Sequence, residues 1–253
     1  MSLQTAIKTH QGKWIRASSR LHVQVALAIT FLGFLIASNN DGALAEPTMP
    51  TTSKSDWIDL LAGGSLEQWM SIGGETPDSL WEVSEGELTL LQGGGGDILT
   101  RRVFQNFELH LDWRISPGGN SGVFYRVAND GQPVWTSGPE YQILDDEFFP
   151  QLAGSTELRG SVFGLYAAKV SPKKPTSAFN TALIRVRGGE VQHWLNGTLV
   201  AQFDMHSDDW RRRVAESKFA IFPSFGRLEE GHIALQDHGN QVWYRNIRIR
   251  EIE

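Results

Sequence analysis

The sequence predicts an all-β sandwich or jelly roll with one short helix. Three observations indicate this class. Apolar residues recur at every second position in many short segments, turn-forming residues separate the segments, and a single stretch has helical periodicity. Such segments build two stacked sheets around one core. From Trp57 onward no second linker interrupts the pattern, so we expect one domain.

The first 45 residues have the three-part pattern of a secretory signal. An uncharged apolar run, 25–37, precedes the cleavage pattern Ala43-Leu44-Ala45, and the basic residues before it are Lys8, Lys13, Arg16 and Arg20. The run has about 13 residues, whereas a membrane-spanning helix needs roughly 20. We therefore expect a cleaved signal peptide at 1–45, not an uncleaved anchor, and a mature chain that is exported and not inserted into the membrane.

Residues 46–55 are polar and Pro-rich and are expected to form a disordered linker before the folded domain at 56–253. Without the signal the chain has 19 basic and 28 acidic residues, a net charge of −9. This charge argues against nucleic-acid partners and anionic membrane surfaces. Cysteine is absent, which excludes disulfides, thiolate nucleophiles and Cys-ligated metals.

Residues 106–115 give the clearest strand, because five apolar residues from Phe107 to Ile115 alternate with polar ones, as on an antiparallel strand with one wet face. The pairs Gly188-Gly189 and Asn196-Gly197 are strong hairpin signals. Further strands are expected at 80–83, 86–91, 97–101, 120–127, 139–145, 161–166, 180–187, 190–196, 198–204, 231–237 and 242–250.

One helix is expected at about 208–217. Ser207 is a good N-cap, and Asp208 and Asp209 suit the positive end of a helix dipole. Trp210 and Val214 share one face, which would pack on the sandwich.

Strand parity selects the candidate site residues, because alternate side chains of a sandwich strand face the core and the solvent. The residues assigned to the core are Val123, Tyr125, Val127, Tyr141, Ile143, Ile233 and Leu235. The opposite faces of the same three segments carry Asn120, Phe124, Arg126, Glu140, Gln142, Gln236 and His238. If these strands are neighbours, they present one polar surface with an acid, a base, a cation and amides.

Such a surface suits carbohydrate, since amides bind sugar hydroxyls and the rings of Trp69, Trp135 and Phe124 could stack on a pyranose. The alternative is an ordinary solvated sheet face with each aromatic ring packed in the core. The amide-rich composition favours a sugar-binding site, because an ordinary solvent-facing sheet surface usually carries Lys, Glu and Thr. Motifs for a serine-hydrolase elbow, a zinc protease, a Walker loop or a Rossmann fold are absent.

Four motifs occur in order. They are Pro117-Gly-Gly-Asn-Ser-Gly-Val-Phe124, Glu140-Tyr-Gln-Ile-Leu-Asp-Asp146, His193-Trp-Leu-Asn-Gly197, and 233–239 followed by 242–249. In this order they resemble the 3-keto-disaccharide hydrolase domain family, also described as 3-keto-glucoside-1,2-lyase and 3-keto-2-hydroxyglucal hydratase. The resemblance runs from about Trp57 to Glu251. It implies a concanavalin-like jelly roll in an exported bacterial protein, secreted or periplasmic, with a 3-keto-sugar or oligosaccharide ligand.

The sequence departs from the family pattern at two places. The opening element reads Leu60-Leu-Ala-Gly-Gly-Ser-Leu66 and lacks the usual acidic or amide residue and the lysine. A usual Glu-Trp-Asn-Thr reads Ala178-Phe-Asn-Thr181.

The chemistry implied by the resemblance is cleavage of 3-keto-glycosides by β-elimination, hydration or both. A 3-keto group acidifies the C2 hydrogen, and its removal gives an enediolate that expels the C1 substituent. The expected catalytic residues are Glu140 and His238, either of which could be the base, and Arg126, which would stabilise the enediolate. A divalent metal held by Glu140 and His238 is the alternative to Arg126, and no organic cofactor is expected. The expected substrate-binding residues are Asn120, Gln142, Gln236, Phe124 and Trp69.

Two other function classes fit the same surface. A non-catalytic, lectin-like carbohydrate-binding module would bind sugar without turnover. A conventional glycosidase needs two carboxylates flanking the scissile bond, and only Glu140 is evident on the expected surface.

Overall fold

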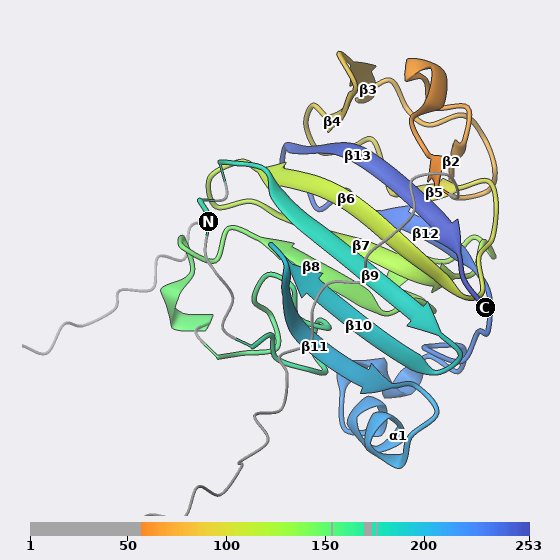
Figure 1. The fold of residues 1–253 in the computed structure, drawn as a ribbon, viewed down its shortest axis with the longest axis vertical. Helices are drawn as coiled ribbons and strands as arrows, with labels where there is room; N and C mark the ends of the chain where they lie inside the picture. Colours follow the sequence, from red (N-terminus) through yellow and green to blue (C-terminus); the bar gives the residue numbers. More distant parts are fainter. Residues whose placement is uncertain (1–56, 153, 170–173, 176) are drawn as a thin grey trace, which may run out of the picture. The chain divides into compact units, whose positions relative to one another are not determined.

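The computed structural model describes residues 57–152, 154–169, 174–175 and 177–253 (Figure 1). The expected signal peptide and linker lie outside the described residues. None of the described helices is long and apolar enough to cross a membrane.

Two antiparallel sheets form the sandwich, and the larger lies in front of the smaller in Figure 1. The larger sheet contains β1 (Ile58–Asp59), β3 (Trp81–Ser84), β4 (Glu87–Leu90), β6 (Phe107–Ile115), β9 (Asn180–Arg187), β10 (Glu190–Leu195), β11 (Thr198–Asp204) and β13 (Val242–Glu251). The smaller contains β2 (Trp69–Ser71), β5 (Ile98–Thr100), β7 (Asn120–Val127), β8 (Glu140–Leu144) and β12 (His232–Leu235).

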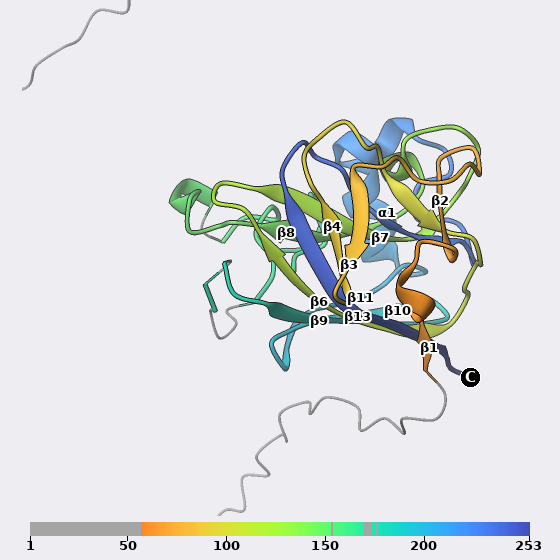
Figure 2. The ribbon, with the colours of Figure 1, turned by 90° about the horizontal axis from the view of Figure 1, so that it is seen from above.

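The strand order is β11-β10-β9-β6-β13-β4-β3 in the larger sheet, with β1 paired to β13, and β2-β5-β12-β7-β8 in the smaller. Figure 2 gives a second view of the same strands, turned by 90°. The described part of the chain is thus an all-β jelly-roll sandwich with one short α-helix, which confirms the predicted fold class.

The helix, α1 (Asp208–Ala215), begins where the sequence predicts, because the Ser207 side chain accepts a hydrogen bond of 3.1 Å from the Trp210 backbone N–H. The described 3-10 turns are Ala62–Gly64, Val134–Thr136, Pro150–Leu152 and Lys218–Ile221.

One strand prediction is wrong. Residues 161–166 form turns in which Val162 makes isolated bridges to Tyr141 and Tyr166. Gly160 and Gly164 have φ of +80° and +72°, which an extended strand does not allow. The short strands β1 and β2 were not predicted, because two or three residues carry no readable alternation.

The core lies between the sheets, where alternate residues of β6 such as Leu111 and Trp113 are fully buried. The outer face of β6 is less exposed to solvent than predicted. Glu108 is 1% exposed, because Arg185 and Arg250 from neighbouring strands pair with it across that face.

The outer face of the smaller sheet is partly covered by a second apolar cluster. Its buried members are Met70, Leu99, Phe124, Val127, Val134 and Ala234. The beginning of β7, the strand β8 and the segment after β12 lie outside this cluster. Val127, assigned to the core between the sheets, therefore packs on the opposite face.

Candidate active site

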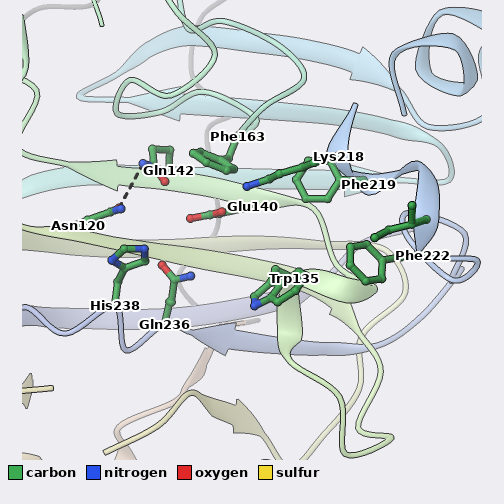
Figure 3. A pocket seen from close by; sticks show the side chains of 11 residues that line it. Asn120, Trp135, Glu140, Gln142, Phe163, Lys218, Phe219, Phe222, Gln236 and His238 are labelled. Carbon is green, nitrogen blue, oxygen red and sulfur yellow. Dashed lines mark hydrogen bonds between the residues drawn. The ribbon is translucent and has the colours of Figure 1, made fainter. Parts of the chain in front are cut away.

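A cavity of about 400 Å³ opens on the part of the smaller sheet that lies outside the second apolar cluster (Figure 3). Polar side chains from adjacent strands form one side of it, and aromatic side chains from loops form the other. The residues that line it are Asn120, Trp135, Glu140, Gln142, Phe163, Lys218, Phe219, Ile221, Phe222, Gln236 and His238.

The sheet register brings the polar residues together. In the smaller sheet β12, β7 and β8 are neighbours. Gly122 pairs with Gln142 across β7 and β8, and the Gln236 backbone N–H donates to the Gly122 carbonyl at 3.0 Å. Tyr141 on the other face of β8 lies in the core. The structure thus places Asn120, Glu140, Gln142, Gln236 and His238 around one cavity, as strand parity predicts.

Glu140 is 8% exposed and lies near the centre of the cavity (Figure 3). Burial raises the pKa of its carboxyl group to about 8, since desolvation penalises the charged form. The Lys218 ammonium opposes this pKa shift, and the Asp97 carboxylate adds to it. A carboxyl group with its pKa raised to this range can accept a proton in one step and return it in another.

The amide side chains have free hydrogen-bonding capacity. Gln142 Nε2 donates to Asn120 Oδ1 at 3.2 Å, which orients both groups. The Oε1 atoms of Gln142 and Gln236 are buried and have no hydrogen-bond partner among the described residues. A buried acceptor without a donor is costly. The hydroxyl groups of a sugar would supply the donors that these two atoms lack.

Aromatic rings and one lysine form the opposite side. Trp135 is 40% exposed and meets Phe222 edge to face, with ring centroids 5.2 Å apart. Lys218 Nζ lies 4.2 Å from the centroid of the Phe163 ring and points toward the centre of the cavity (Figure 3). An open Trp ring beside polar groups is a surface on which a pyranose can stack.

The prediction for Arg126 is wrong, because a β-bulge reverses the parity of β7. His232 pairs with Val127 and Ala234 with Phe124, so Tyr125 and Arg126 together oppose Ile233. Arg126 has a φ of +53°. Its Nη2 donates to the carbonyls of Gln105 and Gly188, and its side chain lines a different cavity.

The predictions for Trp69 and Phe124 are also wrong. Trp69 is fully buried in the core, where its Nε1 donates to the Leu60 carbonyl at 2.8 Å. Phe124 faces outward as predicted but is 1% exposed, because the apolar cluster with Met70 and Val134 covers it. Of the three aromatic candidates, Trp135 lines the cavity.

Sequence reasoning missed Lys218, Phe163, Phe219, Ile221 and Phe222. The residues of 218–222 lie outside every predicted strand, so parity could not assign them a face. Phe163 lies in the segment 161–166, which was predicted as a strand but forms turns. One signal was available: four of the five lie in the run Lys218-Phe-Ala-Ile-Phe222, which is more apolar than a solvated turn needs.

The metal alternative has limited support from side chains. The part of the chain that the structure describes holds no group of three or more His, Asp or Glu that could bind a metal ion. Among the described residues, a metal bound between Glu140 and His238 would therefore have two carboxylate or imidazole ligands and no third.

A jelly-roll sandwich with a pocket of amides, a titratable carboxyl group and open aromatic rings has the features of a carbohydrate-active protein. Comparison with known sequences identifies the group: the chain belongs to the 3-keto-α-glucoside-1,2-lyase-like domain family, whose profile matches residues 56–250. This confirms the resemblance that the four motifs indicate.

Relatives agree with this assignment. A 3-keto-disaccharide hydrolase of Bacteroides thetaiotaomicron is 29% identical over 78% of this chain and 79% of its own length. Two crystal structures of candidate glycosyl hydrolases from Parabacteroides distasonis match 78% of this chain. They have 28% and 27% identity, cover 95% and 99% of their own chains, and give TM-scores of 0.69 and 0.63. The protein is thus a 3-keto-disaccharide hydrolase-like carbohydrate-active protein.

Proposed function

We propose that this protein is an enzyme that cleaves 3-keto-glycosides, with 3-keto-disaccharides as its substrate class, by β-elimination followed by hydration. The observation that carries the proposal is Glu140, a buried carboxyl group whose pKa is raised to about 8 by burial, at the centre of a sugar-sized cavity. The names of the family and of the Bacteroides relative support the 3-keto sugar as substrate.

In the first step the Glu140 carboxylate removes the C2 proton, and the electron pair of the C2–H bond moves into the ketone to give an enediolate. The negative charge that develops on O3 needs a cation. Arg126 was the expected cation but lies outside the cavity, whereas Lys218 points into it. We therefore assign the stabilisation of the enediolate to Lys218.

In the second step the enediolate expels the C1 oxygen, and that oxygen takes up a proton as the C1–O bond breaks. His238 lines the same cavity and is the proposed proton donor. The product is a 3-keto-2-hydroxyglucal. Water then adds at C1 and gives its proton to His238, while Glu140 returns its proton to C2; this completes the hydrolysis and restores both the carboxylate and the protonated His238.

The remaining residues hold the sugar. The unpaired Oε1 atoms of Gln142 and Gln236 accept hydrogen bonds from its hydroxyls, and Asn120 fixes the orientation of Gln142. Trp135 stacks on one sugar face. We also propose, from the pattern of residues 1–45, that the enzyme is exported to the periplasm or the medium.

A comparison of a 3-keto-disaccharide with its parent disaccharide tests the proposal. The keto sugar should be cleaved and the parent sugar should be inert, because its C2 hydrogen is not acidic. Glu140→Gln should lower turnover by about 10² or more, the scale of losing a general base, with a smaller effect on binding. Glu190→Gln, which changes an exposed carboxylate at the start of β10, is the matched control.

Binding of the keto sugar without turnover would contradict the proposal and identify a carbohydrate-binding module. Cleavage of the parent disaccharide at a comparable rate would indicate a conventional glycosidase. The same assay with and without a chelator separates the metal-dependent from the metal-free version.

A further inference from the structure

A second cavity, of about 630 Å³, lies beside α1 and the residues that follow it. The proposed reaction does not use it. Its apolar lining includes Trp210 and Phe225, whose buried rings are stacked with centroids 6.1 Å apart. Arginine side chains line the same cavity, so it combines an aromatic base with positive charge.

Arg126 is the most unusual of these side chains. It is 2% exposed, and its Nη2 donates to the carbonyls of Gln105 and Gly188. Its Nε is buried and has no partner among the described residues. The nearest carboxylate oxygen, on Glu229, is 3.9 Å from Nη1, beyond hydrogen-bond distance.

Arg159 shows what a paired buried arginine looks like in the same molecule. It is 4% exposed, and its Nη2 contacts the carboxylate of Asp146 directly. A buried guanidinium is ordinarily neutralised in this way. Arg126 lacks such a partner, and burial lowers its pKa. A carboxylate that entered the cavity could supply the missing interaction.

Glu229 indicates where such a carboxylate would sit. Its side chain is 57% exposed. Its Oε1 lies 3.0 Å from His206 Nε2, and its Oε2 lies 3.9 Å from Arg126 Nη1. Arg227 also lines the cavity and makes no ion pair with a described residue. Arg126 and Arg227 therefore give the cavity more positive charge than Glu229 alone offsets, since Arg211 pairs with Asp208.

We propose that this cavity is a second binding site, separate from the Glu140 cavity, for a small carboxylate carried on an aromatic ring. The carboxylate displaces the Glu229 side chain and binds Arg126, and the ring packs against Trp210 and Phe225. The proposal does not depend on the reaction assigned to the first cavity.

Calorimetric titration of the purified protein with phenylacetate tests this site, with phenylacetamide as the uncharged probe of the same shape. Phenylacetate should bind at one site, and phenylacetamide at least tenfold more weakly, because charge-assisted hydrogen bonds are the strong ones. Arg126→Gln should weaken phenylacetate binding about tenfold or more. Glu140→Gln should leave it unchanged.

Glu229→Gln keeps the test decisive if Arg126→Gln fails to fold. Glu229 is exposed, and removing its competing charge should tighten phenylacetate binding severalfold. Absence of binding, equal binding of phenylacetamide, or weaker binding to Glu229→Gln would each overturn the proposal. If Glu140→Gln lost phenylacetate binding and Arg126→Gln kept it, the ligand would lie in the first cavity, and the proposal would again be overturned.

Discussion

The carboxyl group of Glu140 lies against the α-carbon of Gly122 on the neighbouring strand. A β-carbon on residue 122 would lie 2.2 Å from Glu140 Oε1 and 2.8 Å from its Cδ and Cγ. Both distances are shorter than real contacts. Glycine at 122 is therefore required by the position of the Glu140 side chain, since φ at Gly122 is not positive.

Gly122→Ala should displace the Glu140 carboxyl group and lower turnover at least tenfold, because a catalytic group that is 1 Å out of place loses much of its effect. The fold should survive, since Glu140 can swing away into the cavity. Steady-state kinetics and a thermal melt measure the two effects. Adding Gly122→Ala to Glu140→Gln should cost little more turnover. A full tenfold loss in the double variant would mean that Gly122 acts independently of Glu140.

The pH dependence of kcat/KM follows from the pKa of Glu140. As a base Glu140 must be ionised, and its pKa is raised to about 8. Activity should rise with pH across the neutral range and level off above about pH 8. A profile that falls over this range would make Glu140 a proton donor in the rate-limiting step.

Lys218→Met should move this profile to higher pH, because the Lys218 ammonium holds the pKa of Glu140 down. It should also lower the maximal rate, since the enediolate loses its cation. Lys169→Met, at an exposed lysine that does not line the cavity, is the control and should leave the profile in place. An unchanged profile in Lys218→Met would remove Lys218 from the account.

Trp135→Ala should raise KM by about tenfold and leave kcat within a few fold, the result of losing uniform binding to a stacked sugar. The cost in stability should be small, because Trp135 is 40% exposed. Phe148→Ala, at an exposed aromatic residue outside this cavity, is the matched control. Equal KM values for the two variants would show that Trp135 does not contact the substrate.

The sequence was sufficient to predict Glu140, Gln142, Gln236 and His238, because their segments alternate regularly. Tyr141, Ile143, Ile233 and Leu235 face the core, which fixes the opposite face as outward. This local rule needs no knowledge of distant residues. It holds wherever a strand has no bulge.

The rule fails at Arg126 because of the bulge in β7. A residue that accommodates the bulge is Gly231, just before β12, where a β-carbon would lie 2.5 Å from the Arg126 carbonyl carbon. A glycine beside a strand run is a weak bulge signal that parity does not use. Parity misses the covering of Phe124 and the position of Lys218 for another reason. Segments far away in the sequence cover the sheet face at Phe124 and bring Lys218 to the cavity.

Export is tested by N-terminal sequencing of the protein from its native host. The pattern at Ala43-Leu44-Ala45 predicts a mature chain that begins at or near Glu46. Recovery of an intact chain from Met1 in the cytosol would contradict the assignment of residues 1–45 as a cleaved signal.

Incubation of the protein with a 3-keto-glucoside in deuterated water, followed by NMR of the recovered sugars, tests the elimination mechanism most directly. Removal of the C2 proton by Glu140 and its later return through solvent-exchangeable groups predict deuterium at C2 of the 3-keto sugar product. Glu140→Gln should lower this incorporation and cleavage together, by about 10² or more. Cleavage with no deuterium at C2 would mean direct displacement at C1 and would contradict the roles assigned to Glu140 and His238.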